Sequence, residues 1–319
     1  MNNDQDYYSI AAPFCTVEEL EPLLKAGVSE AYFGIMTDQW KKRYGDAEFI
    51  TRRQSQLAHI SSFRQFPEII EIVSEYHATA TLVVNADYSE EQMPYVLEII
   101  SEWEGSGGNA VMVSDLGVLM HLQWQNSRLA RYLSVMAGVF NHESVAFFHQ
   151  LGVSRVVLPR ELKLIEMNSI VRNSVTDMEF EVISMFQKCQ YIDSFCNFIH
   201  AVNEGSFQIN RDTPGHRAVN LCHGCAMPFY SEGIRVIPLP RSETNTPYCA
   251  ACQLTGLVDI GIRHFKIAGR GYAPHLILKA ASFIKYSIER LHKPDDEIIA
   301  EYTRTFGTSC KKKFCYYSK

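Results

Sequence analysis

Short apolar runs rich in β-branched residues alternate with longer amphipathic segments along most of the chain. The runs predict eight strands, at Tyr7–Ala12, Glu30–Ile35, Thr79–Ala86, Asn109–Ser114, Tyr132–Ala137, Ser154–Pro159, Glu179–Ser184 and His264–Gly269. Apolar positions between most of them recur with a helical period, as in Ser89–Trp103 and Pro274–Leu291. This alternation predicts a parallel sheet, and eight strands favour a closed (β/α)8 TIM barrel over an open doubly wound sheet.

Two helix starts carry the spacing of a capping box, Thr16 with Glu19 and Ser89 with Gln92. The regular alternation is broken most strongly by a loop-rich segment over residues 186–261, between the seventh and eighth predicted strands. We therefore expect one barrel domain over residues 1–295 that includes this insertion, followed by a C-terminal tail over residues 296–319. In a barrel, the insertion would emerge on the carboxyl-end face, where active sites are found.

The overall charge and the hydropathy pattern narrow the classes of protein. The chain has 319 residues, a net charge of −6 and an isoelectric point near 6.0, which argues against a free-standing nucleic-acid binder. No apolar run reaches the roughly 20 residues that a membrane helix needs, and the N-terminus does not resemble a secretion signal. We expect a cytoplasmic protein without membrane insertion.

Six of the nine cysteines lie in the insertion, as a Cys-x6-Cys pair followed by the motifs CHGC and CAAC. They are Cys189, Cys196, Cys222, Cys225, Cys249 and Cys252. In a reducing compartment such a density favours metal binding over disulfides. The two CxxC motifs alone would suit a zinc ribbon, which leaves the first pair unexplained. A [4Fe–4S] cluster, held by cysteines from dispersed positions, is the preferred prediction and zinc the alternative.

The remaining cysteines give weaker signals. Cys15 follows the first strand, where a buried apolar role and a place on the catalytic face are about equally expected. Cys310 and Cys315 flank the sequence KKKF in a polar tail and are expected to be exposed and without a role.

Polar residues at the predicted strand ends are the candidates for substrate binding, because these positions build the site of a barrel enzyme. They are Asn85, Asp115, Asn141, Arg160, Glu161, Lys266 and Arg270. Asp115 has the alternative role of a helix N-cap. Arg160, Glu161 and Lys266 have the alternative of structural ion pairs at the barrel rim. Arg52 and Arg53 could reach the barrel mouth from the second loop, but are more typical of solvated charges.

The chain resembles the collagenase-like peptidases, peptidase family U-thirty-two. The resemblance rests on "VMVSDLGVL" (Val111–Leu119), "HQLGVSRVVLPREL" (His149–Leu162), the Cys-x6-Cys pair and "HFKIAGR" (His264–Arg270). It implies a barrel with a [4Fe–4S] cluster on four cysteines. It also implies oxygen-independent hydroxylation of a small molecule such as a ubiquinone precursor, or of an RNA, with prephenate as the oxygen donor. Nucleic acid is the less expected substrate. The alternatives are a peptidase, or a non-catalytic subunit that forms a heterodimer with a related family member.

The resemblance also assigns the cluster ligands. The family's four cysteines fall on Cys189, Cys196, Cys225 and Cys249, with Cys222 and Cys252 as alternates. The chain departs from the family at Met185–Phe186, where His-Gly is usual, at Met136–Gly138, where Gln-Met-Asn is usual, and at Ala268, where an acid is usual. Neither HExxH nor GxSxG occurs, which disfavours the common peptidase mechanisms.

Overall fold

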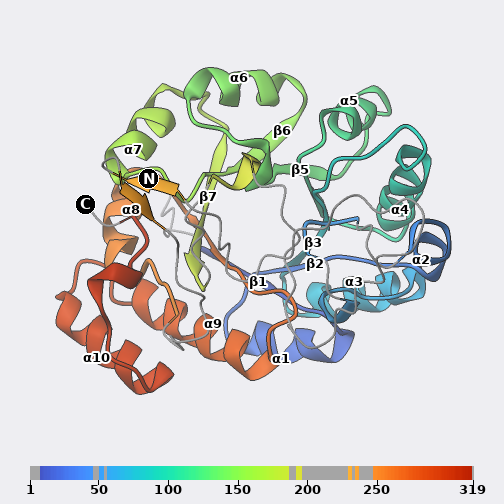
Figure 1. The fold of residues 1–319 in the computed structure, drawn as a ribbon. Helices are drawn as coiled ribbons and strands as arrows, with labels where there is room; N and C mark the ends of the chain where they lie inside the picture. The colour runs from blue at the N-terminus through green and yellow to red at the C-terminus, as the bar shows by residue number, and fades with distance from the viewer. Residues whose placement is uncertain are drawn as a thin grey trace, which may run out of the picture.

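Eight parallel strands close into a barrel in the computed structural model, which describes residues 8–45, 50–53, 56–186, 192–195, 229–231, 234–236 and 247–317 (Figure 1). The strands are β1 (Ser9–Pro13), β2 (Glu30–Phe33), β3 (Thr79–Val84), β4 (Ala110–Val113), β5 (Ala130–Leu133), β6 (Val153–Val157), β7 (Glu179–Met185) and β10 (His264–Ile267). Each pairs with its neighbour in sequence, and β10 closes the barrel between β7 and β1. The predicted (β/α)8 barrel and its eight strands are confirmed. A short antiparallel pair, β8 (Phe229–Ser231) and β9 (Ile234–Val236), belongs to the insertion.

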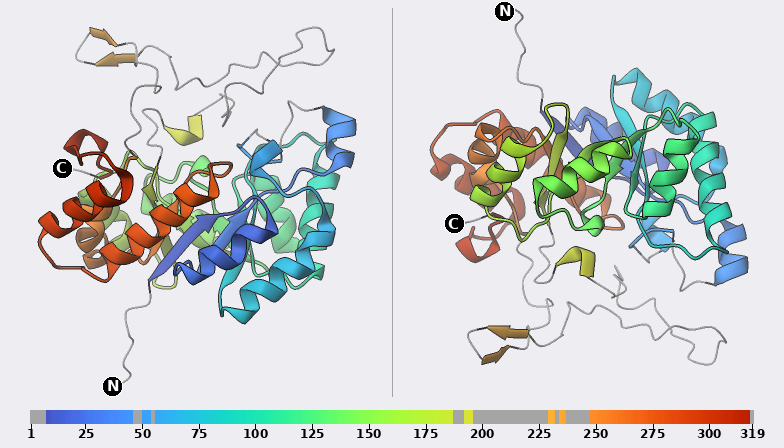
Figure 2. Two further views of the ribbon diagram at one scale, coloured as in Figure 1. Left: turned by 90° about the horizontal axis from the view of Figure 1, so that it is seen from below. Right: turned by 90° about the horizontal axis from the view of Figure 1, so that it is seen from above.

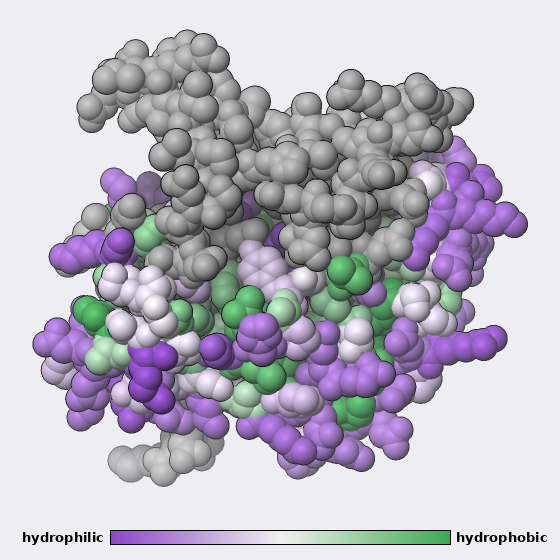
Figure 3. Space-filling view, turned by 60° about the horizontal axis from the view of Figure 1, so that its bottom comes forward, coloured by the Kyte–Doolittle hydropathy of each residue, from purple (hydrophilic) through white to green (hydrophobic). Residues whose placement is uncertain are grey.

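Helices cover the outside of the barrel along its length (Figures 1 and 2). They are α1 (Leu20–Lys25), α2 (Asp38–Tyr44), α3 (Phe66–Glu75), α4 (Met93–Gly105), α5 (Leu116–Trp124), α6 (His142–Gln150), α7 (Leu164–Asn173), α8 (Leu254–Asp259), α9 (Pro274–Ile288) and α10 (Asp295–Phe306). Short 3-10 helices lie at Val17–Glu19, Gln56–Ala58, Phe63–Gln65, Val135–Ala137, Asp193–Phe195, Ala251–Gln253 and Lys312–Phe314. On the face seen in Figure 3 the described side chains are mostly hydrophilic, with smaller hydrophobic patches between them.

Aromatic side chains pack the strands against the helices on one side of the barrel. The ring of Phe33 lies 5.0 Å from Phe14, 6.0 Å from Phe66 and 5.2 Å from Trp103, measured between centroids. All four side chains are fully buried. Tilted and edge-on ring contacts of this kind add to the free energy gained from burying the apolar area itself. This packing fixes β1 and β2 against α3 and α4.

Some local expectations are corrected. The side chain of Thr16 makes no capping hydrogen bond, while Glu19 accepts one from the backbone N–H of Cys15 at 2.9 Å. The second capping box is half formed, since Gln92 accepts from the backbone N–H of Ser89 at 3.0 Å. The fifth strand ends at Leu133 rather than at residue 137. There the chain turns into a 3-10 helix that ends at Gly138, whose φ of 67° suits glycine.

The C-terminal residues pack against the barrel. Phe283 of α9 contacts Tyr302 of α10, with ring centroids 5.7 Å apart. The hydroxyl of Tyr316 donates to the carbonyl of Phe186 at 3.0 Å, and that of Tyr317 to the carbonyl of Ile183 at 2.9 Å. Both tyrosines are buried. The expectation that Cys310 and Cys315 are exposed is wrong, because both are half-buried between these contacts.

No helix in the described part of the chain is both long enough and apolar enough to cross a membrane.

Candidate functional site

A cavity of about 120 Å³ lies at the carboxyl ends of the barrel strands. Its walls come from residues at or just after β2 to β7 and β10 and from the loop after β2. The 3-10 helix Asp193–Phe195 contacts the one at Val135–Ala137 and lies over this end of the barrel (Figure 2). The cavity therefore occupies the position at which barrel enzymes build their sites.

Four of the seven predicted substrate-binding residues line this cavity: Asn85, Arg160, Lys266 and Arg270. Asp115, Asn141 and Glu161 are not among its lining residues. Arg52 and Arg53 do line it, so the expectation that they are solvated charges is corrected. The alternative that they reach the barrel mouth from the second loop is the one that holds.

Arg270 is the most unusual of these residues. Its side chain is buried, and Nη2 donates to the hydroxyl of Thr51 at 3.1 Å. Nη1 has no hydrogen-bond partner among the described residues. Burial, together with nearby Arg53, lowers the pKa of the guanidinium to about 10. A Cβ atom at Gly34 would collide with Nη1, so this glycine provides the space that the guanidinium occupies. Arg270 is thus a buried cation without a carboxylate partner in the described structure.

The other two cavity cations that the sequence predicted are paired with carboxylates. Arg160 donates from Nε to Asp193 Oδ2 at 2.7 Å, and from Nη2 to the second oxygen. Lys266 Nζ lies 3.0 Å from Glu181 Oε1 and 3.8 Å from the centre of the Tyr32 ring. The expected alternative of structural ion pairs holds for both, although Arg160 pairs with Asp193 and not with Glu161.

Asn85 links two parts of the cavity wall. Its Oδ1 accepts from the backbone N–H of Arg52 at 3.2 Å, and its Nδ2 donates to the hydroxyl of Ser134 at 3.0 Å. The side chain therefore positions the arginine-bearing loop against β3 and the end of β5.

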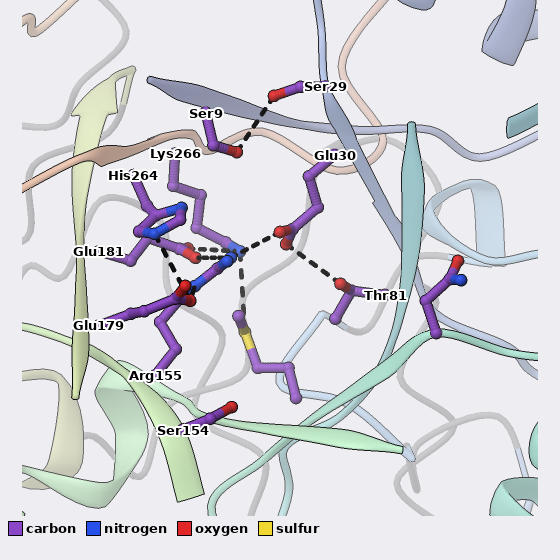
Figure 4. A network of polar contacts seen from close by, with 12 residues as sticks. Ser9, Ser29, Glu30, Thr81, Ser154, Arg155, Glu179, Glu181, His264 and Lys266 are labelled. Atoms are coloured by element: carbon purple, nitrogen blue, oxygen red, sulfur yellow. Dashed lines mark hydrogen bonds and ion pairs between the residues drawn. The ribbon is translucent and has the colours of Figure 1, made fainter. Parts of the chain in front are cut away.

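Charged side chains fill the barrel interior beside the cavity (Figure 4). Arg155 of β6 donates to Glu30 of β2 at 2.5 Å, and its Nη1 lies 3.4 Å from Glu181 of β7. Its Nε donates to Glu179 at 2.8 Å, and its guanidinium lies 4.0 Å from the Tyr132 ring centre. Four strands of the barrel are thereby joined through a single side chain.

The pKa values in this network are set by burial and by the two cations. Burial would raise the pKa of Glu181, but Lys266 and Arg155 outweigh it and hold the pKa below its usual value. Burial dominates at Glu30, whose pKa is raised despite Arg155. Burial, together with Arg155, lowers the pKa of His264 to about 4, so the imidazole is neutral at physiological pH. The lowered pKa of Glu181 keeps its carboxylate ionised beside the Lys266 side chain at the cavity wall.

Asp115 and Asn141 cap helices. Asp115 Oδ1 accepts from the backbone N–H of Val118 at 3.0 Å, and Oδ2 accepts from that of Tyr88 at 3.2 Å. Asn141 Oδ1 accepts from Ser144 at 2.9 Å. These contacts satisfy backbone donors at the starts of α5 and α6, which is the alternative role expected for Asp115.

Replacing Asp115 with alanine is expected to lower the free energy of unfolding by about 1 kcal/mol, because a helix N-cap is lost. Affinity of the cavity for an anion such as prephenate should stay unchanged. Chemical denaturation and ligand titration check the two parts, with Asp115→Asn as the control that keeps a capping oxygen. A large loss of ligand affinity at unchanged stability would instead place Asp115 in the binding site.

The cysteine predictions divide between described and undescribed residues. Cys189, Cys196, Cys222 and Cys225 lie outside the described residues. Cys249 is buried and forms a β-bridge with Met185, so the end of the insertion returns to the carboxyl end of β7. In the described ranges, no group of three or more His, Cys, Asp or Glu side chains is arranged to hold a metal ion.

Cys15 has the character of a buried thiol. Its sulfur accepts from the backbone N–H of Gly271 at 3.2 Å. Burial, with a contribution from Glu19, raises its pKa to about 11. The thiol is therefore protonated at neutral pH, which is the opposite of a nucleophilic cysteine.

Phe186 marks the point where the insertion leaves β7. Its φ is 70°, a conformation that bulky residues rarely adopt. Glycine is usual here in the family that the sequence resembles, so the phenylalanine carries strain of about 1–3 kcal/mol. Packing against Tyr272, at a centroid distance of 5.3 Å, and the hydrogen bond from Tyr316 offset this strain.

The fold and the cavity define a (β/α)8-barrel protein with a cationic site at the carboxyl ends of its strands. A family model described as Peptidase family U32 matches residues 15–319, so the chain belongs to that family. A solved U32 peptidase structure covers 61% of this chain and 76% of its own, at 12% identity and a TM-score of 0.45.

The relatives reported below are named either as RNA hydroxylation proteins or as a collagenase. The chain is 33% identical to tRNA hydroxylation protein P of Escherichia coli (strain K12) over 36% of this chain, which is 24% of that protein. A 23S rRNA 5-hydroxycytidine synthase of the same organism is 23% identical over 76% of this chain and 34% of its own length. A collagenase of Porphyromonas gingivalis is 21% identical over 96% of this chain and 72% of its own length. The match to the first relative thus spans about a quarter of that protein.

Proposed function

We propose that this chain is an iron–sulfur protein that takes part in oxygen-independent hydroxylation, or in a related redox modification, of a small molecule or biomolecule. The cavity would bind an anionic co-substrate, such as prephenate as the oxygen donor. The observation that carries the proposal is Arg270, a buried cation that borders the cavity without a carboxylate partner among the described residues.

Burying an unpaired cation is costly, and this cost is relieved when an anion binds. Arg53 borders the same cavity and raises the cost further, as the lowered pKa of Arg270 reflects. The wall at position 268 is an alanine, where the family usually has an acid. A carboxylate from a ligand would therefore supply the negative charge that the protein wall does not.

The cysteine donors fit an iron–sulfur centre. Thiolates are the usual ligands of such clusters, and the insertion that carries the cysteines leaves and rejoins the barrel beside the cavity. Cys189 and Cys196 would hold the cluster, with further ligands from Cys225 or its alternate Cys222 and from Cys249 or its alternate Cys252. Such a cluster, when bound, supplies one-electron redox chemistry. The chain's own residues bind and orient the anion through Arg270, Lys266 and Asn85.

The names of the relatives support a role in hydroxylation and leave the substrate class open. Two of them act on RNA by name, and the net charge of −6 makes a large RNA surface less expected here. Cooperation with a related family member as a heterodimer, in the cytoplasm, is part of the proposal.

A peptidase is the second candidate, because the family and one relative carry that name. A cysteine peptidase needs a thiolate activated by a base. Burial raises the pKa of Cys15 to about 11 and that of Cys252 to about 12. These thiols are not nucleophilic at neutral pH, which makes hydrolysis the weaker proposal.

The test is metal analysis of the full chain purified without oxygen. We expect about four irons and four sulfides per chain, lost in Cys189→Ala and in Cys196→Ala. Cys15→Ala is the matched control, because it removes a buried thiol from another part of the barrel. Absence of sulfide from the wild type, or iron that persists in both variants, would overturn the iron–sulfur proposal.

A further inference from the structure

Among the lining residues that the structure describes, one acidic side chain borders the cavity, and it does not come from the barrel wall. The cations that line the cavity are Arg52, Arg53, Arg160, Lys266 and Arg270. The acid is Asp193, in the 3-10 helix Asp193–Phe195 that lies over this end of the barrel and that we call the cover turn (Figure 2). The wall is therefore cationic, and the carboxylate that lines the cavity belongs to a separate segment.

Arg160 holds this carboxylate with two hydrogen bonds. Its Nε donates to Asp193 Oδ2 at 2.7 Å, and its Nη2 donates to Oδ1. Both side chains are buried. A buried guanidinium needs such a partner, because a charge without one is costly to bury. The planar guanidinium matches carboxylates in general in this two-bonded way, so a carboxylate of a ligand would make the same two contacts. Asp193 thus occupies a position that suits a ligand.

The cover turn buries little apolar surface of its own. Phe195 is 77% exposed, and Ser194 is half-buried. Ser194 lies so close to Gly138 that a Cβ atom at the glycine would collide with it. A segment with few buried apolar contacts can open locally at a small cost in free energy. The ion pair with Arg160 is therefore important for keeping the cover turn in place, and an anion that takes over Arg160 would release it.

We propose that Arg160 is a second carboxylate-binding position of the cavity and that Asp193 is its built-in competitor. A dicarboxylate ligand would place one carboxylate at Arg270, as in the proposed function on which this inference rests, and the other at Arg160 in place of Asp193. A monocarboxylate would bind at Arg270 and leave the Arg160–Asp193 pair intact. Asp193 thus weakens the binding of dicarboxylates in proportion to its occupancy of Arg160. Binding of a dicarboxylate in turn releases the cover turn.

The experiment is calorimetric titration of the full-length protein with two related anions. Prephenate carries two carboxylates, and phenylpyruvate carries one together with the same 2-oxo acid side chain. Asp193→Asn removes the competing charge and keeps the shape of the side chain. We expect it to tighten prephenate binding at least roughly fivefold and to change phenylpyruvate binding by less than about twofold. Unchanged or weaker prephenate binding in Asp193→Asn would overturn the proposal and leave the pair with Arg160 as a structural contact.

Two further variants show whether the effect passes through Arg160. Asp177→Asn is the matched control, because it removes a carboxylate that lies 3.2 Å from His149 at the surface, and it should change neither affinity. In an Arg160→Met background, Asp193→Asn should no longer tighten prephenate binding, since both substitutions act on one contact. If Asp193→Asn still tightens it there, Arg160 is not the position for which ligand and Asp193 compete, and the proposal fails.

The same titrations separate this inference from the proposed function. If both anions bind the wild type and Asp193→Asn tightens neither, the inference is wrong and the anion site at Arg270 stands. If neither anion binds the wild type, the anion site fails and this inference fails with it.

Hydrogen exchange on the wild type keeps the test decisive if a variant does not fold. The backbone N–H of Phe195 donates to the carbonyl of Ile192 at 3.1 Å, which closes the cover turn. Prephenate should speed exchange of this amide, because it displaces Asp193, and phenylpyruvate should not. Exchange that slows or stays unchanged with prephenate, or that changes equally with both anions, would contradict the displacement of Asp193.

Discussion

Replacing Arg155 with leucine is expected to lower the free energy of unfolding by about 3–5 kcal/mol. The guanidinium is the shared partner of Glu30, Glu179 and Glu181, and the first and last of these are almost completely buried. Without the guanidinium, the buried carboxylates of Glu30 and Glu181 have Lys266 as their cationic neighbour among the described residues. Equilibrium unfolding in denaturant, followed by circular dichroism, measures the change.

The matched control is Arg128→Leu. Arg128 is mostly exposed and forms a 3.7 Å ion pair with Glu104. The same substitution there should change stability by no more than about 0.5 kcal/mol. Adding Glu30→Gln to Arg155→Leu should recover part of the loss, because one uncompensated charge disappears with it. Equal effects of the two arginine substitutions would show that the buried network does not stabilise the barrel.

The loss should also depend on pH. Arg155 lowers the pKa of both Glu30 and Glu181, so both pKa values rise in the folded variant. A carboxyl whose folded pKa lies above its unfolded value costs stability at high pH, and this cost disappears as protonation becomes complete in both states. The difference in free energy of unfolding between the wild type and Arg155→Leu should therefore narrow as the pH falls from about 7 to 5. If the difference in free energy of unfolding grows instead, the destabilisation by Arg155→Leu does not come from the uncompensated carboxylates.

The sequence predicted the barrel because strand periodicity and helical periodicity are local signals. It also placed Asn85, Lys266 and Arg270 correctly at the cavity, because parallel strands carry the residues that follow them to one end. The interior network was missed although a signal exists. Glu179 and Glu181 alternate with apolar residues along one strand, as do His264 and Lys266 along another, and such alternation places a polar face inside the barrel.

Contacts between distant segments could not be predicted in the same way. The pairing of Arg160 with Asp193 depends on how the insertion returns over the barrel. The meeting of Cys249 with Cys315 depends on the path of the tail after α10. Neither path follows from periodicity or local propensity, so the sequence alone predicts an exposed tail for Cys310 and Cys315.

Replacing Arg270 with methionine is expected to weaken binding of prephenate roughly 30- to 150-fold. A charge-assisted hydrogen bond in a buried site contributes about 2–3 kcal/mol. Stability at neutral pH should stay equal or rise, since the lowered pKa of Arg270 means that burial disfavours its charged form. Calorimetric titration with prephenate, and with phosphate for comparison, measures affinity, and denaturant unfolding measures stability.

Arg263→Met is the matched control at the opposite end of β10. Arg263 precedes β10 at its amino end, where Nη1 donates to the backbone carbonyls of Val258 and Ile262. Its loss should leave anion affinity unchanged. Affinity of the wild type should fall as the pH rises past about 10, where Arg270 loses its proton, and the Arg270→Met variant should not show this fall. If Arg270→Met destabilises the fold by more than about 2 kcal/mol and leaves prephenate affinity intact, Arg270 is a structural residue. The proposed anion site would then lose the observation that carries it.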